Sequence, residues 1–366
     1  IAAGLQRPGR LVGMHFFNPA PLMALVEIVS GLASERPLAD TLFDTAAAWG
    51  KTPVHAKSTP GFIVNRVARP YYAEGLRLLQ EGAADCATID AVMREAGGFR
   101  MGPFELMDLI GHDTNFAVTN SVFEANFGDK RYVPSLVQRE LVDGGLLGRK
   151  SGRGFYTYPE GAPALPATAH EAPLAMGPVT VHGDGEIADR LEQLVAQGGL
   201  SGDAAPSRQR QSAWVGLDIG GARLVLTDGR TAGDIAAREG IADVAVFDRP
   251  LLWPAAPGGT LAYAVAPQAS AGWRRQAPAW LAALGFVPVP LADAPGLVVA
   301  RTIAMLINEA TDAVQQGVCT PEGADAAMKL GVNYPAGPFE WLARWSVAGV
   351  TQVLEALDVH YRGERY

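Results

Sequence analysis

Gly102-Pro103-Phe104-Glu105 recurs unchanged as Gly337-Pro338-Phe339-Glu340, and this pair of stretches decides how the chain is organised. Position 337 lies 235 positions after 102, and at that constant offset 14 of the 46 residues in 60–105 are identical to those in 295–340, without a gap. Average composition would give roughly three identities. The chain therefore contains an internal duplication.

Both copies have the pattern of helical bundles. Each begins with a proline, Pro60 or Pro295, whose fixed φ suits the first turn of a helix. The spacing of apolar residues predicts a helix of about twenty residues after each proline. Further helices are expected over 88–95, over 321–330 and after each Gly-Pro-Phe-Glu stretch.

A second kind of pattern separates the two bundles. Residues 159–175 are rich in Ala, Pro and Gly and predict a linker. The segment after it predicts a small parallel α/β unit, whereas the polar residues 203–212 predict no strand. The strands are expected at 179–182, 223–227, 243–247, 261–265 and 286–290.

The turn after the first of these strands, Gly183-Asp184-Gly185-Glu186-Ile187-Ala188, has the form of a nucleotide-binding Gly-x-Gly-x-x-Ala turn. Such a turn needs an acidic residue at the end of the next strand to bind ribose. Because 203–212 predicts no strand, a vestigial turn is the favoured interpretation.

Composition excludes several classes of function. The chain has 366 residues, 48% of them hydrophobic, and a net charge of −8, so it gives no broad cationic surface for nucleic acid. No apolar run approaches the ~20 residues of a membrane span and no signal peptide is recognised, so a cytoplasmic protein is expected. Cys86 and Cys319 are isolated, which indicates neither a disulfide nor a metal site.

The stretch with the clearest chemistry is Leu11-Val12-Gly13-Met14-His15-Phe16-Phe17-Asn18-Pro19, followed by a second apolar run at 24–29. Both flanks are strand-like, and the chain is expected to reverse near Pro21. In an antiparallel pair centred there, His15 and Glu27 are equidistant from the turn, so they should lie opposite each other on one face.

A carboxylate beside an imidazole suits acid–base catalysis, because it fixes the tautomer and stabilises the imidazolium. The structural alternative is that His15 is an ordinary core histidine and Glu27 a charge at the strand edge. The residues at these positions leave both interpretations open.

His15-Phe16-Phe17-Asn18-Pro19, Glu27 and Thr59-Pro60-Gly61-Phe62-Ile63-Val64-Asn65-Arg66 together resemble the signature of the 3-hydroxyacyl-CoA dehydrogenase family. The resemblance implies that His15 is the general base, that Glu27 orients it and that Asn65 reaches the substrate oxygen. It places Asn18 beside the nicotinamide ring of NAD, although a purely conformational Asn-Pro turn is an equal alternative.

The resemblance implies a mixed α and α/β fold with two all-helical C-terminal domains, each preceded by a Rossmann-type unit. The first unit is expected to be a remnant and the second reduced. The expected ranges are 1–57 for the remnant of the NAD-binding domain, 58–158 for the first helical domain, 159–175 for the linker, 176–290 for the reduced Rossmann-like domain and 291–366 for the second helical domain. Because the glycine loop would precede Ile1 and the second copy stops in mid-domain, we expect a chain truncated at both ends that is inactive alone.

The constant offset places Pro250, Ala262 and Ala300 at the positions of His15, Glu27 and Asn65, so the second copy is expected to be inactive. We expect its helical domain to pair with the first one inside the chain, in place of a partner subunit. A further homo-oligomer is left open.

The predicted function is therefore the NAD-dependent interconversion of (S)-3-hydroxyacyl-CoA and 3-oxoacyl-CoA. By resemblance to the tandem-repeat bacterial enzymes, it would serve fatty-acid or aromatic (phenylacetate) catabolism on an acyl-CoA thioester substrate. One alternative is a catalytically inactive assembly or dimerisation scaffold of the same fold. Another is a β-hydroxyacid dehydrogenase with a catalytic lysine in the helical region, but 58–128 contains no Lys.

Overall fold

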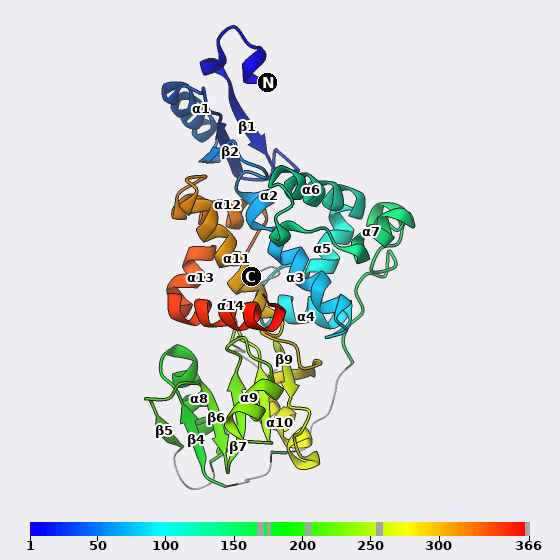
Figure 1. Ribbon diagram of the computed structural model, residues 1–366, viewed down its shortest axis with the longest axis vertical. Helices are drawn as coiled ribbons and strands as arrows, with labels where there is room; N and C mark the ends of the chain where they lie inside the picture. Colours follow the sequence, from blue (N-terminus) through cyan, green and yellow to red (C-terminus); the bar gives the residue numbers. More distant parts are fainter. Residues whose placement is uncertain (167–171, 174–176, 202–205, 254–258, 363–366) are drawn as a thin grey trace. The chain divides into compact units, whose positions relative to one another are not determined.

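The chain forms helices around two separate β-sheets, as predicted (Figure 1). The computed structural model describes residues 1–166, 172–173, 177–201, 206–253 and 259–362. It divides into two compact units, and each unit combines residues from both sequence copies. Unit 1 consists of Ile1–Ala73, Met107–Gly154 and Thr302–Val350, and unit 2 of Glu74–Leu106, Phe155–Arg301 and Thr351–Tyr366.

Unit 1 contains a three-stranded sheet. Strand β1 (Val12–Phe16) pairs antiparallel with β2 (Leu25–Ser30), which pairs parallel with β3 (Thr52–Lys57). Helix α1 (Arg36–Ala48) packs against all three strands (Figure 1). The core between them is made of small and branched apolar side chains, because alternate residues of a strand point to one face. Its buried members are Val26, Ile28, Ala39 and Ala46.

The helices of the two copies follow the predicted order. In the first copy they are α2 (Val64–Val67), α3 (Arg69–Gln80), α4 (Cys86–Glu95), α5 (Pro103–Ile110), α6 (His112–Ala125) and α7 (Leu136–Asp143), with 3-10 turns at Lys130–Tyr132 and Arg149–Ser151. In the second copy they are α11 (Val299–Gln315), α12 (Pro321–Gly331), α13 (Pro338–Trp345) and α14 (Val347–Tyr361).

The predicted starts of the long helices were four residues too early. Pro60 and Pro295 precede glycines in the left-handed region, Gly61 with φ 78° and Gly296 with φ 69°, so neither proline begins a helix. The first copy also breaks at Ala68, where a single helix of about twenty residues was expected.

Unit 2 contains a seven-stranded sheet. Its strands are β4 (Val179–His182), β5 (Ser207–Gln209), β6 (Gly216–Ile219), β7 (Ala222–Leu226), β8 (Val244–Phe247), β9 (Gly259–Val265) and β10 (Phe286–Pro290), in the spatial order β10-β9-β8-β7-β6-β4-β5. Helices α8 (Glu186–Gln197), α9 (Ala232–Glu239) and α10 (Ala271–Ala283) contact it. The five predicted strands are confirmed.

Two expectations about this sheet were wrong. It is mixed and not parallel, because β6 and β7 form an antiparallel hairpin through Gly220 and Gly221, both with positive φ. A strand also lies within 203–212: β5 pairs with β4 at the sheet edge. An edge strand can be polar, and Arg208 is held there by ion pairs to Asp189 and Glu192 of α8.

The last three expectations concern the linker, membrane-spanning helices and metal sites. Residues 167–171 and 174–175 of the predicted linker lie outside the described residues. Among the residues that the structure does describe, every helix is too short or too polar to cross a lipid bilayer. The same residues contain no group of three or more His, Cys, Asp or Glu side chains that could hold a metal ion.

Candidate active site

The predicted pairing of His15 with Glu27 is confirmed by the strand register. His15 lies directly opposite Glu27 in the antiparallel β1–β2 pair. The imidazole Nδ1 lies 2.5 Å from Oε2 of the carboxylate. The His15 side chain is 33% exposed whereas Glu27 is fully buried, so the ring can meet a ligand while its partner is shielded from water.

The second oxygen of Glu27 holds the start of helix α2. Oε1 accepts hydrogen bonds from the backbone N–H groups of Ile63 and Val64, both at 3.0 Å. These groups lack partners within the helix, and a carboxylate at a helix N-terminus is favoured by the helix dipole. One buried side chain thus links β2, the His15 ring and the first turn of α2.

Asn65 follows Val64 directly and therefore lies in the turn that Glu27 holds. Its carbonyl oxygen accepts a hydrogen bond from Arg69 Nε at 2.8 Å. The Arg69 guanidinium is buried over the Tyr72 ring, and this burial lowers its pKa. The backbone at Asn65 is therefore fixed from both sides.

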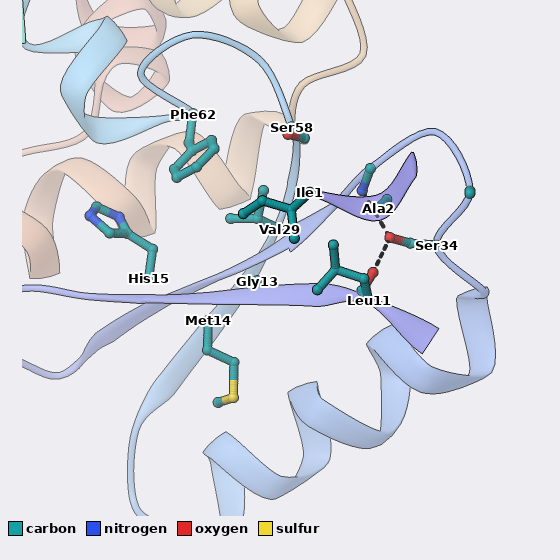
Figure 2. A pocket seen from close by; sticks show the side chains of 12 residues that line it. Ile1, Ala2, Leu11, Gly13, Met14, His15, Val29, Ser34, Ser58 and Phe62 are labelled. Atoms are coloured by element: carbon teal, nitrogen blue, oxygen red, sulfur yellow. Dashed lines mark hydrogen bonds between the residues drawn. The ribbon is translucent and has the colours of Figure 1, made fainter. Parts of the chain in front are cut away.

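A cavity of about 490 Å³ opens beside His15 (Figure 2). The His15 and Phe62 rings lie on the same side of β1, with centroids 5.5 Å apart, whereas Met14 projects from the opposite side (Figure 2). The cavity is mainly apolar. It is lined by Ile1, Ala2, Leu11, Gly13, Met14, His15, Val29, Gly31, Ala33, Ser34, Ser58 and Phe62.

Asn18 lies outside this group of residues. It occupies the turn between β1 and β2, where its peptide bond to Pro19 is cis, and it does not line the described cavity. The structure therefore brings together His15, Glu27 and the start of α2, whereas a role for Asn18 beside a cofactor stays a prediction.

The corresponding strands of the second copy correct the earlier alignment. Ala262 is the counterpart of Glu27. The β8–β9 register places Asp248, and not Pro250, opposite Ala262. The Asp248 N–H donates a hydrogen bond to the Ala262 carbonyl at 2.9 Å. The constant offset failed here because the connection between the strands is longer than in the first copy. Asp248 thus occupies the position of His15.

Asp248 does in the second copy what Glu27 does for α2. Its carboxylate accepts hydrogen bonds from the N–H groups of Val298, Val299 and Ala300 at the start of α11, at 2.9, 2.7 and 2.9 Å. The carboxylate is buried, and burial raises its pKa to about 6. The second copy therefore has a helix-holding acid at the position where the first copy has the imidazole.

Residues of the second copy also support the site in unit 1, which sequence reasoning missed. Helix α12 contacts α2, β2 and β3, and the Lys57 N–H donates to the Val318 carbonyl at 2.8 Å. A Cβ on Gly331 would lie 2.7 Å from Leu25, so a glycine permits this close approach. Burial, with a smaller effect of the Glu27 charge, raises the pKa of the adjacent Cys319 thiol to about 11.

Comparison with known protein families assigns most of the chain. The model described as "3-hydroxyacyl-CoA dehydrogenase, C-terminal domain" matches residues 61–158 and again 296–366. "3-hydroxyacyl-CoA dehydrogenase, NAD binding domain" matches 1–59. "3-hydroxybutyryl-CoA dehydrogenase reduced Rossmann-fold domain" matches 224–295. The repeated match of the first model reproduces the internal duplication.

Individual relatives agree. A 3-hydroxyadipyl-CoA dehydrogenase of Escherichia coli (strain K12) is 43% identical over 366 residues, which are 100% of this chain and 70% of that protein. A crystal structure of 3-hydroxybutyryl-CoA dehydrogenase from Escherichia coli K12 superposes with a TM-score of 0.85 at 40% identity, covering 99% of this chain and 69% of that one. A probable 3-hydroxybutyryl-CoA dehydrogenase of Deinococcus radiodurans is 42% identical over 158 residues, 43% of this chain and 56% of that protein.

Proposed function

This chain belongs to the 3-hydroxyacyl-CoA dehydrogenase family, and on that premise we propose that it interconverts (S)-3-hydroxyacyl-CoA and 3-oxoacyl-CoA with NAD. The observation that carries the proposal is the bond between His15 Nδ1 and the buried carboxylate of Glu27. It leaves Nε2 as the ring nitrogen that can exchange a proton with a substrate.

In the oxidation direction, Nε2 of His15 takes the proton of the 3-hydroxyl group as the C3–H bond breaks. The resulting imidazolium donates through Nδ1 to Glu27, whose negative charge stabilises it. Asn65 would donate its side-chain N–H to the substrate oxygen, where negative charge develops as the proton leaves. In the reduction direction His15 returns the proton to that oxygen.

The residues around the cavity fit the ring end of the cofactor. The lining beside His15 is mainly apolar, and Phe62 supplies an aromatic side chain next to it. Such a pocket suits a flat nicotinamide ring. Asn18 lies outside the lining of this cavity, so its place beside the ring is expected only from the family resemblance. A bound NAD would supply the acceptor for the hydride that leaves C3 of the hydroxyacyl chain.

We propose an acyl-CoA thioester of fatty-acid or aromatic (phenylacetate) catabolism as the substrate. The Escherichia coli relative that matches the whole chain is named for 3-hydroxyadipyl-CoA, which supports such a pathway here. Because CoA thioesters are made and consumed inside cells, the proposal includes a cytoplasmic location.

We also propose that the second helical repeat replaces the partner subunit of a dimer. In unit 1, α12 of the second copy contacts α2 of the first, which supports pairing within the chain. Covalent linkage raises the effective concentration of the two halves and removes the need for a separate subunit.

Replacing His15 tests the proposed chemistry. In the full-length protein, His15→Ala should lower the turnover of acetoacetyl-CoA with NADH by ~100-fold or more, because a general acid–base group is lost. Asn65→Ala should lower kcat more than it changes KM. His55→Ala, which removes a histidine of β3 that stacks on Phe43, is the matched control and should keep activity. Unimpaired turnover by His15→Ala would remove the proposed base.

A further inference from the structure

The side chain that follows Asn65 is held by the other copy of the repeat. Arg66 is 3% exposed, and three of its nitrogens donate to side chains of α11 and of Gln316, the residue directly after this helix. Nε lies 2.6 Å from Glu309 Oε1, Nη2 lies 2.6 Å from Asp312 Oδ2, and Nη1 lies 2.9 Å from Gln316 Oε1. A guanidinium bound along its whole edge has a single orientation.

Glu309 is the fixed member of this cluster. It is 1% exposed, and the same Oε1 that binds Arg66 accepts the hydroxyl hydrogen of Tyr132 at 2.5 Å. Arg131 adds a second cation beside Asp312, at 2.9 Å. Because Glu309 also accepts the hydrogen bond from Tyr132, its carboxylate stays in place if the Arg66 side chain shifts. The position of Glu309 therefore determines the position of Arg66.

Helix α2 depends on such external anchors. It has only four residues, too few to be stable on its own hydrogen bonds. Glu27 holds its first turn and Arg69 holds the Asn65 carbonyl. Arg66 is the anchor at the next residue, so a shift of its side chain moves the backbone that carries Asn65.

The same pair exists in unit 2 without an active site. Arg301 and Glu74 are the counterparts of Arg66 and Glu309 at the offset of 235, and Arg301 Nε lies 2.6 Å from Glu74 Oε2. The residue before Arg301 is Ala300, which has no polar side chain to position. The two pairs have the same chemistry and burial, but only one adjoins a proposed catalytic residue.

We propose that Glu309, a residue of the copy that lacks the imidazole, is a positioning residue for Asn65 and acts through Arg66. The inference rests on the proposed function, in which Asn65 contacts the substrate oxygen. It gives the second repeat a part in turnover beyond burying an apolar face.

The test compares Glu309→Gln with Glu74→Gln in the full-length protein, each alone and combined with Asn65→Ala. Both single variants break a buried arginine–glutamate pair and should lower Tm to a similar extent. Only Glu309→Gln should lower kcat, by about 10-fold with KM within about twofold, since small displacements of a positioned group are costly. In the Asn65→Ala background it should cause no further loss of kcat.

Equal kcat losses in Glu309→Gln and Glu74→Gln, or a Glu309→Gln loss that persists without Asn65, would overturn the inference. Should Glu309→Gln not fold, Tyr132→Phe removes one hydrogen bond from Glu309 and should give about a threefold loss that depends on Asn65. If Asn65→Ala lowers kcat and Glu309→Gln does not, only this inference is refuted. If Asn65→Ala has the kcat of the wild type, the assignment of Asn65 in the proposed function is refuted.

Discussion

Glu27 shows how one buried side chain can serve both chemistry and architecture. Its Oε2 faces the His15 imidazole and its Oε1 accepts two N–H groups at the start of α2. The second copy separates these tasks, because Asp248 holds the start of α11 while no imidazole is present opposite Ala262. The helix-holding task therefore exists without the proton-transfer task.

Two substitutions of Glu27 should separate the tasks. Glu27→Gln keeps an oxygen for the N–H groups of α2 but places an amide against His15, so turnover should fall by about 10-fold or more while unfolding free energy changes by about 1 kcal/mol. Glu27→Ala removes both contacts and should cost about 3 kcal/mol. Urea unfolding and steady-state turnover measure the two effects, and an equal loss of stability in both variants would contradict the division.

Among the residues of the site, the sequence predicted the contact that follows from the symmetry of a hairpin about its turn. The turn residues around Pro21 were enough to set His15 opposite Glu27, because register in a hairpin follows from the turn. The hydrogen bonds from Glu27 to residues 63 and 64 were not predicted, since they join segments 36 or more positions apart. The role of Asn18 stays a prediction.

The start of helix α11 is held by Asp248, a buried acid whose protonation depends on folding. Burial raises the pKa of Asp248 from 3.8 to about 6, although four backbone N–H groups oppose the shift. Between about pH 4 and pH 6 the folded protein therefore keeps a proton that the unfolded chain has released, so unfolding free energy falls as pH rises through this window.

Asp248→Asn should abolish that component of the pH dependence. Urea unfolding at pH 4, 5, 6 and 7 would show the difference in stability between the wild type and Asp248→Asn changing between pH 4 and 6 and staying constant above it. Glu355→Gln, at an exposed position of α14, is the control and should leave the curve parallel to that of the wild type. Parallel curves for Asp248→Asn would show that its proton affinity does not change on folding.

The elements that the sequence missed share a physical reason. Strand β5 is polar because it lies at a sheet edge and is held through Arg208 by ion pairs to α8. Strand β6 has only four residues and pairs through a two-glycine turn. A periodic pattern of apolar residues predicts strands that face a core, as it did for β7 to β10. It does not predict strands that are stabilised mainly by strand pairing or by ion pairs.

In the whole molecule, the duplication accounts for two buried arginine–glutamate pairs. Arg66 and Arg301, and likewise Glu74 and Glu309, are identities visible in the sequence repeat. The sequence could not show that each arginine pairs with the glutamate of the other copy. This pairing arises because each compact unit contains residues of both copies. The pairing of the two helical domains as a substitute for a dimer remains our proposal.

Deleting residues 176–366 tests this proposal. The deletion removes Glu309 and Asp312 and leaves Arg66 without these two carboxylate partners, which is destabilising. We expect the remaining chain to associate with itself or to aggregate when examined by analytical ultracentrifugation. A folded, soluble monomer with the helical content of residues 1–158 would contradict the proposed role of the second repeat.

In the proposed reaction, His15 transfers the proton while hydride moves between C3 of the acyl chain and NAD. The most direct measurement is the single-turnover rate of NADH oxidation after mixing the full-length enzyme with acetoacetyl-CoA, for the wild type and His15→Gln. Glutamine can hydrogen bond to Glu27 but cannot supply a proton. We predict a rate at least ~100-fold slower in the variant with NADH affinity retained, whereas a rate within a few-fold of the wild type would contradict the account.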